Sequence, residues 1–281
     1  GFTGLQTCEY FNDQNWIASG TTRDTNKKVN PNIKLIEYNP NKGKIYLSES
    51  LASSKILLIS IAPDKNGDVV LKSNYEDIAN ALKTSVKRVI YLSTTAVYGD
   101  ANGSTVDEKY KINPQSDRAK SRILAESQWT DLCDKFGVTL NILRLSGIYG
   151  TGRNQIRNLI NGTAKRIIKE GHVFNRIHVV DIARIIYMLS VSDIKSDIFN
   201  ISDDMPAPPQ DVVEFAARLL NTDPPEPVIF SEAILSEMAR SFYSETKYII
   251  NQKIKEKLGL ELKYPNYKLG LKDILKEELN R

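Results

Sequence analysis

The sequence is poor in the residues that build metal centres and disulfide frameworks. Its 281 residues include two cysteines, Cys8 and Cys133, and two histidines, His172 and His178. Cysteines without paired spacing exclude a disulfide framework and a zinc site, and two histidines exclude a histidine-rich metal centre. We therefore expect no bound metal, two free buried thiols and few options for a Ser-His-Asp triad.

Long apolar runs and a strong charge bias are also missing. No run approaches the roughly 18 apolar residues of a membrane span, and the first residues lack the basic and apolar regions of a signal peptide. Lys and Arg exceed Asp and Glu by only four, 38 against 34, and the basic stretch 165–169 has no interleaved aromatic residues. We therefore expect a cytoplasmic monomer or homodimer with a small-molecule substrate and neither a nucleic-acid nor a membrane partner.

Apolar runs of strand length alternate with stretches of helical periodicity over the first half of the chain. The predicted strands are Trp16–Ser19, Ile33–Tyr38, Lys55–Ala62, Val86–Ser93 and Val138–Leu145. The predicted helices between them are Leu5–Asn12, Val69–Thr84 and Ser116–Phe136. This alternation predicts an α/β fold, a Rossmann-type doubly wound parallel sheet with helices on both faces.

The pattern loosens after Leu145, where glycines and prolines become frequent. The elements we predict there are a helix at Val179–Val191, a strand at Ile198–Ser202, helices near Gln210–Leu220 and Ser244–Leu258, and an exposed terminal helix at Lys272–Arg281.

These patterns divide the chain into two regions. We expect an NADP-binding Rossmann domain at 1–145, to which 179–202 return. Residues 146–178 and 203–281 then form a smaller, α-rich substrate lobe.

A glycine turn leads directly into the first predicted helix and consists of Gly1, Phe2, Thr3 and Gly4. In dinucleotide-binding folds such glycines let the backbone approach the pyrophosphate at a helix N-terminus. The usual fingerprint also has a preceding strand and one more glycine. We therefore expect the first strand of the sheet to be absent from this sequence, and the chain to be a piece of a longer protein.

The next predicted strand is followed by Thr21, Thr22 and Arg23. An acidic residue at this point would bind the 2′-hydroxyl of NAD, whereas two hydroxyls and a guanidinium suit a 2′-phosphate. The pattern favours NADP as the cofactor, with NAD as the alternative. An exposed arginine at a strand end without any ligand is the other interpretation.

Several longer motifs extend this pattern over nearly the whole chain. They are LLISIAP at Leu57–Pro63, YLSTTAVYGD at Tyr91–Asp100, RLSGIYGTGRN at Arg144–Asn154, FNRIHVVDIAR at Phe174–Arg184, FNISDDMPAPPQDV at Phe199–Val212 and MARSFY at Met238–Tyr243. In these motifs the chain resembles the extended and atypical short-chain dehydrogenase/reductases of the NAD-dependent epimerase/dehydratase superfamily. The nucleoside-diphosphate-sugar epimerase-like branch is the most similar.

The resemblance implies positions for several site residues. Thr94, three residues before the valine of VYG, corresponds to the family's catalytic hydroxyl residue. The cofactor is expected along Ser93 and along the end of the preceding strand, which consists of Ser60, Ile61 and Ala62.

The resemblance also reveals one departure. Active members of the family carry a Tyr-x-x-x-Lys pair on the helix after VYG, in which the tyrosine moves a proton and the lysine binds the nicotinamide ribose. This chain has Arg118 and Arg122 at those positions. A guanidinium cannot exchange protons near neutral pH, but Arg118 can bind an anionic substrate group and Arg122 can reach ribose or phosphate.

The resemblance therefore implies an NADP-binding oxidoreductase acting on a nucleotide-sugar or carbonyl substrate. Without the Tyr-Lys pair, the proton must pass through Thr94, Tyr149 or an ordered water. Tyr98, in the VYG turn, is expected to be structural. The alternative is a non-catalytic NADP(H)-binding sensor or scaffold.

Overall fold

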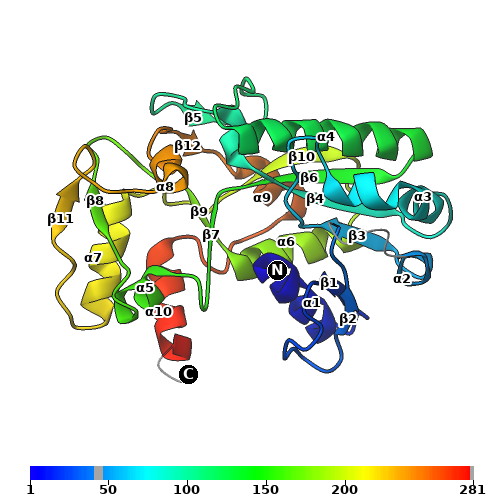
Figure 1. The fold of residues 1–281 in the computed structure, drawn as a ribbon, viewed down its shortest axis with the longest axis horizontal. Coiled ribbons are helices and arrows are strands. Elements are labelled where there is room, and N and C mark those ends of the chain that lie inside the picture. The colour runs from blue at the N-terminus through cyan, green and yellow to red at the C-terminus, as the bar shows by residue number, and fades with distance from the viewer. Residues whose placement is uncertain (41–46, 279–281) are drawn as a thin grey trace. The chain divides into compact units, whose positions relative to one another are not determined.

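The computed structural model describes residues 1–40 and 47–278 (Figure 1). The chain forms two compact units. The first contains Gly1–Val97, Pro114–Arg144 and Ile182–Phe199. The second contains Tyr98–Asn113, Leu145–Asp181 and Asn200–Arg281.

The first unit is built on a four-stranded sheet. Its order is β10-β6-β4-β3, formed by Asp197–Ile201, Thr139–Leu145, Arg88–Thr94 and Ile56–Ile59 respectively. β3 and β4 run parallel, and β4 and β6 are buried along almost their whole length, as expected for strands covered on both faces. β1 (Ser19–Thr22) and β2 (Lys34–Glu37) form a separate parallel pair.

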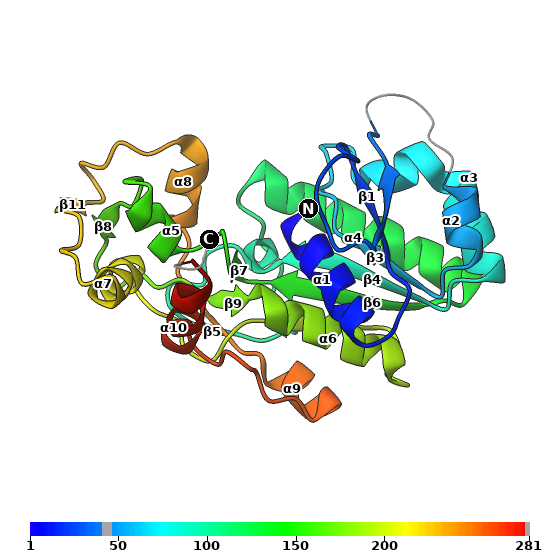
Figure 2. The same cartoon turned by 90° about the horizontal axis from the view of Figure 1, so that it is seen from below.

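Helices cover the two faces of this sheet. α3 (Val69–Thr84) and α4 (Asp117–Phe136) lie on one face, and α1 (Phe2–Asp13) and α6 (Val179–Val191) lie on the other (Figures 1 and 2). A short helix, α2 (Ser48–Ala52), precedes β3.

Polar residues fix the ends of the two longest helices. Asp68 accepts hydrogen bonds from the backbone N–H groups of Val70 and Leu71 at the start of α3, and Ser116 accepts one from Ala119 at the start of α4. α4 ends at Gly137, whose φ of 64° is the left-handed conformation that glycine adopts without strain.

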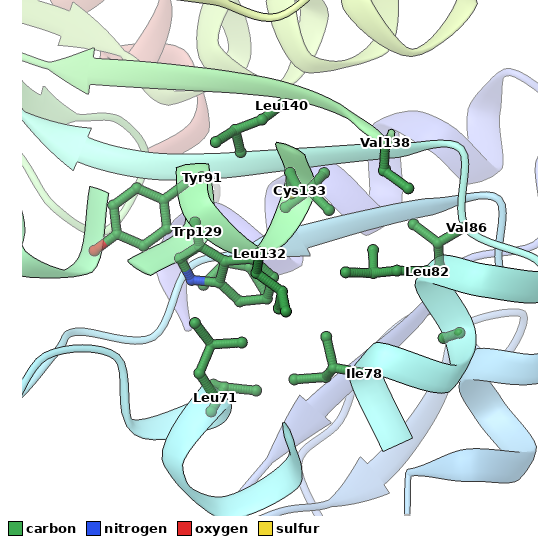
Figure 3. Close-up of a cluster of buried hydrophobic side chains, with 14 of the residues drawn as sticks. Leu71, Ile78, Leu82, Val86, Tyr91, Trp129, Leu132, Cys133, Val138 and Leu140 are labelled. Carbon is green, nitrogen blue, oxygen red and sulfur yellow. The ribbon is translucent and has the colours of Figure 1, made fainter. Parts of the chain in front are cut away.

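The apolar core of the first unit lies between the sheet and α3 and α4 (Figure 3). Trp129 of α4 is fully buried and lies among Leu71, Ile78 and Leu132. Cys133 is buried in the same cluster, and burial raises the pKa of its thiol to about 12. A group with that pKa stays protonated and unreactive at neutral pH.

The second unit consists of three short parallel strand pairs and several helices. The pairs are β7–β9 (Gly147–Tyr149, Arg176–His178), β8–β11 (Arg166–Ile168, Pro227–Ile229) and β5–β12 (Thr105–Val106, Tyr248–Ile249). The helices are α5 (Gln155–Ile160), α7 (Pro209–Leu219), α8 (Glu237–Phe242), α9 (Gln252–Leu258) and α10 (Tyr267–Glu278). α5, α7 and α10 share one apolar cluster.

The α/β fold is confirmed, and the helices predicted at Val69–Thr84 and Val179–Val191 have the predicted bounds. The strand predicted at Trp16–Ser19 is wrong: β1 begins at Ser19, and Trp16 instead packs edge-on against Phe11.

The single helix predicted at Ser244–Leu258 is also wrong. Its first half is extended, because Asn175 bonds the carbonyl of Lys247 and the N–H of Ile249. The described part of the terminal helix ends at Glu278, and residues 279–281 lie outside the described residues. Glu278 is buried, whereas the prediction expects an exposed helix.

The described residues contain neither a membrane-spanning helix nor a metal-binding cluster. None of the helices within 1–40 and 47–278 has both the length and the apolar character to cross a bilayer. Over the same ranges, no three His, Cys, Asp or Glu side chains gather as metal ligands would. Both cysteines are free thiols, and Cys8 is half-buried rather than buried.

Candidate cofactor-binding site

The glycine turn lies at the N-terminus of α1. Gly1 is the N-cap, makes no side-chain cap bond, and no acidic residue occupies the first turn. A helix N-terminus of this kind favours a negative group. Phe2 is half-buried, and the side chain of Thr3 is buried, which leaves the backbone as the part of Thr3 suited to a ligand.

The structure brings this turn next to the end of β3. A Cβ atom added to Gly4 would lie 3.3 Å from the Ser60 hydroxyl oxygen, a tight contact that glycine avoids. Ser60 and Ala62 are exposed, and Ile61 is half-buried. Two segments predicted to contact the cofactor, about 55 residues apart in sequence, therefore meet at one place.

The end of β1 presents an exposed cationic side chain, Arg23, beside polar groups that are hydrogen-bonded. The Thr22 hydroxyl donates to the backbone carbonyl of Asp24 at 3.0 Å and accepts from its N–H at 3.2 Å. The Asp24 carboxylate accepts the N–H of Asn26 at 3.0 Å. Thr21 and Arg23 are exposed. The sequence prediction did not consider Asp24, which follows Arg23 in the chain and whose Oδ1 accepts the hydrogen bond of a local turn.

The carboxyl end of β4 carries two hydroxyl residues in different environments. Thr94 is half-buried, and its hydroxyl accepts the N–H of Ala96 at 3.2 Å. Ser93 is buried, and its hydroxyl donates to the Glu126 carboxylate. Thr94 is therefore the hydroxyl that a ligand can reach, while Ser93 is committed to α4.

Three charged residues spaced four apart lie on one face of α4, namely Arg118, Arg122 and Glu126. Arg118 is exposed. The Nη1 group of Arg122 donates to the Leu92 carbonyl at 2.6 Å and to the Tyr91 hydroxyl at 3.2 Å. The two arginines at the Tyr-x-x-x-Lys positions thus differ: one faces solvent and the other is bound to β4.

Burial raises the pKa of the Tyr91 hydroxyl to about 12, although the nearby Arg122 charge lowers it. Tyr91 is fully buried on β4. It therefore holds its proton at neutral pH and does not supply the phenol that α4 lacks.

A buried ion pair lies beneath this site. Arg144, at the end of β6, donates from Nη2 to Glu126 Oε2 at 2.7 Å and from Nε to Oε1 at 3.2 Å. Both side chains are less than a tenth exposed. Sequence reasoning missed this pair, and the position of Glu126 four residues after Arg122 was the signal that could have suggested it.

Tyr149 belongs to the second unit and is buried. Its hydroxyl donates to the Asn266 carbonyl at 3.5 Å, and its ring lies edge-on to His178 at 5.0 Å. Burial, reinforced by the charges of Asp203 and Asp181, raises its pKa far above the usual range. Tyr149 therefore does not titrate near neutral pH.

Tyr98 and the two histidines are also buried side chains with structural roles. The Tyr98 hydroxyl donates to Asn200 at 2.7 Å, and the ring is fully buried. Burial lowers the pKa of His172 and of His178 to about 4, so both are neutral at pH 7. His178 accepts the N–H of Val180 through Nδ1.

A parallel sheet with helices on both faces, and a glycine turn at the start of α1, define a Rossmann-fold protein. A family model, the NAD dependent epimerase/dehydratase family, matches residues 71–202. Protein YeeZ from Escherichia coli K12 is 31% identical over 225 residues, covering 78% of this chain and 74% of YeeZ. The chain belongs to the NAD-dependent epimerase/dehydratase family.

Solved structures share the fold of this chain. A functionally unknown conserved protein from Silicibacter pomeroyi is 38% identical, with a TM-score of 0.83, and the match covers 98% of this chain and 94% of that protein. MoeE5 in complex with UDP-glucose and NAD shares the fold, with a TM-score of 0.76 at 18% identity over 99% and 97% of the two chains.

Proposed function

We propose that this chain binds NADP(H) and acts as an epimerase/dehydratase-type oxidoreductase on a small carbonyl or nucleotide-sugar substrate. The observation that carries the proposal is the meeting of the glycine turn at Gly4 with Ser60 at the end of β3. The turn would hold the pyrophosphate, and the bound cofactor would supply or accept a hydride.

The end of β1 supports NADP over NAD. One oxygen of the Asp24 carboxylate, Oδ1, accepts the N–H of Asn26 in a local turn, and Arg23, the preceding residue, is exposed. A guanidinium suits a 2′-phosphate, whereas an NAD site needs a carboxylate free to bind the ribose diol. Thr21, also exposed, adds a hydroxyl to the same place.

The proton route proposed here passes through Thr94 or an ordered water. Tyr149 is buried with a strongly raised pKa, which disfavours it as the proton carrier. Arg118, exposed on α4, would bind an anionic group of the substrate. Arg122 would reach ribose or phosphate with the N–H groups that β4 does not use.

A second candidate is a non-catalytic NADP(H) sensor or scaffold. Two observations favour it: α4 carries no tyrosine, and the arginine at the lysine position is bound to the backbone of β4. Such a protein would retain cofactor affinity without turnover. For both candidates we propose a small-molecule ligand, a monomer or homodimer, and a cytoplasmic location.

Two measurements test these candidates. Thermal shifts with NADP, NADPH, NAD and NADH test cofactor binding, and the proposal fails if none of the four stabilises the protein. Oxidation of NADPH followed at 340 nm, with panels of carbonyl compounds and sugar nucleotides, then separates enzyme from sensor. The Arg118→Ala/Arg122→Ala variant gives the background rate, and Lys120→Ala, an exposed change on the same helix, is the matched control.

A further inference from the structure

A groove lies on the first unit between α3 and α4, the two helices that cover one face of its sheet (Figure 1). Its volume is about 570 Å³, and small-molecule sites have volumes of roughly 300–1,000 Å³. Leu71 and Leu132 line it, and both are buried beside Trp129 (Figure 3). The groove therefore has an apolar floor that belongs to the core of the unit.

The Asp68 carboxylate is a buried polar group in the lining of this groove. Asp68 is 2% exposed. Its Oδ1 accepts the backbone N–H groups of Val70 and Leu71. Its Oδ2 is also buried and accepts no hydrogen bond from any residue within 1–40 and 47–278. A buried carboxylate oxygen without a donor costs free energy, so this position favours a ligand that brings one.

The other charged side chains of the lining differ in their surroundings. Lys72 Nζ lies 4.0 Å from Asp64 Oδ2, and Lys135 Nζ lies 5.6 Å from the centre of the Phe136 ring. Asp131, on α4, is exposed, and in the part of the chain that the structure describes it has neither a hydrogen bond nor an ion pair. The carboxylates of the groove are therefore the charged groups that lack an oppositely charged partner.

Two further side chains shape the site. Tyr75 of α3 is 48% exposed, and an aromatic ring attracts a cation to its face. Gln128 of α4 is held in place next to the buried carboxylate. Its Oε1 accepts the N–H of Asp68 at 2.8 Å, and its Nε2 donates to the carbonyl of Asn66 at 3.3 Å. These bonds fix α4 against the start of α3, so the groove has a defined shape at this point.

We propose that the groove between α3 and α4 binds a small organic cation, an amine or amidine with an apolar body. The cationic group would donate to Asp68 and face Asp131. The apolar body would lie on Leu71 and Leu132, beside the ring of Tyr75. The inference goes beyond the proposed function, because the groove shares no residue with the candidate cofactor-binding site and requires no cofactor.

Chemical shifts of the backbone amides test the proposal on the whole chain without NADP(H). The probes are benzylamine and benzyl alcohol, which share a ring and differ in the charge of the polar group. We expect benzylamine to shift the amides of Leu71, Lys72 and Leu132. We also expect it to bind at least about tenfold more tightly than benzyl alcohol, because a charge-assisted hydrogen bond is stronger than a neutral one.

Substitutions in the groove assign this preference to its carboxylates. Asp68→Asn retains the start of α3, because asparagine caps a helix about as well as aspartate. We expect it to lower benzylamine affinity about tenfold or more and to leave benzyl alcohol affinity unchanged. Asp131→Asn should cause a smaller loss in the same direction. Asp134→Asn, an exposed change on α4 outside the lining, is the matched control and should change neither affinity.

Three results would overturn the proposal. The first is equal affinity for benzylamine and benzyl alcohol, which means that the groove recognises only the apolar ring. The second is unchanged benzylamine affinity in Asp68→Asn. The third is a dimer, detected by analytical ultracentrifugation, that protects the amides of α3 and α4 from exchange and excludes benzylamine, since the groove then receives a second copy of the chain.

Discussion

Arg144 of β6 and Glu126 of α4 form a buried, two-point ion pair, with Nη2 2.7 Å from Oε2 and Nε 3.2 Å from Oε1. The same carboxylate accepts the Ser93 hydroxyl of β4. One side chain therefore joins α4 to two neighbouring strands at their carboxyl ends. It fixes the helix that carries Arg118 and Arg122 relative to the sheet.

Removing one partner of this pair leaves a buried charge uncompensated. We expect Glu126→Gln to lower the free energy of unfolding by about 3–5 kcal/mol, as measured by urea denaturation. Asp117→Asn, which removes an exposed ion pair and the acidic residue of the first turn of the same helix, should cost at most about 1 kcal/mol. An equal effect of the two substitutions would contradict a special role for Glu126.

The two arginines of α4 should behave differently. Arg122→Ala removes hydrogen bonds to Leu92 and Tyr91, and we expect a loss of about 1 kcal/mol in the free energy of unfolding. Arg118→Ala removes an exposed side chain and should not change stability, although it should weaken binding of an anionic ligand. If both variants lose the same stability, the assignment of Arg122 to β4 is wrong.

The shifted pKa values of three buried groups in the second unit predict that the free energy of unfolding is greatest near pH 6.5. Burial raises the pKa of Asp203 to about 8, and lowers those of His172 and His178 to about 4. From pH 4 to 6.5 the unfolded histidines bind more protons than the native ones, so stability rises with pH. Native Asp203 retains its proton up to about pH 8, so its contribution falls as pH rises above about 4.

Between pH 4 and 6.5 the gain in stability from the two histidines therefore exceeds the loss from Asp203, and above pH 6.5 the loss from Asp203 remains. Its slope is at most about 1.4 kcal/mol for each pH unit. Asp203→Asn should abolish the fall between pH 6.5 and 8 in denaturant titrations. Asp204→Asn, at the neighbouring half-exposed carboxylate paired with Lys255, should retain that fall.

Gly270 of α10 has no room for a side chain. A Cβ atom there would overlap the hydroxyl and ring of Tyr149, which is held against His178. Glycine to alanine in a helix interior ordinarily stabilises, by roughly 0.5–1 kcal/mol. We expect the opposite sign for Gly270→Ala, a loss of about 1–3 kcal/mol in thermal or urea unfolding. A Tyr149→Leu background, which creates space, should reduce that loss.

Much of the fold of the first unit could be predicted from the sequence. A strand that is buried on both faces, such as β4, leaves a continuous apolar run in the sequence. A helix that is buried on one face, such as α3, leaves apolar residues at helical spacing. Both patterns are local, so both elements are predictable from the sequence. The start of β1 is predicted three residues too early, because the apolar Trp16 packs against Phe11 and is not part of a strand.

The contacts that define the site depend on partners far away in the chain. Arg144 lies 18 residues from Glu126, and Gly152 lies 126 residues from Glu278. No local sequence pattern identifies such pairs. From the sequence alone, a buried charged residue near the end of the chain cannot be told apart from an exposed one. For the same reason, the burial of Tyr149 could not be predicted from its place in a glycine-rich motif.

The proposed selection of NADP by the end of β1 can be tested directly. Binding of NADPH and NADH should be measured by titration calorimetry on the unmodified protein, on Arg23→Ala, and on Lys27→Ala as a nearby exposed control. We expect NADPH to bind more tightly than NADH, and Arg23→Ala to reduce NADPH affinity about tenfold or more while leaving NADH affinity unchanged. Tighter binding of NADH to the unmodified protein, or an equal loss for both cofactors in Arg23→Ala, would contradict the proposed preference for NADP.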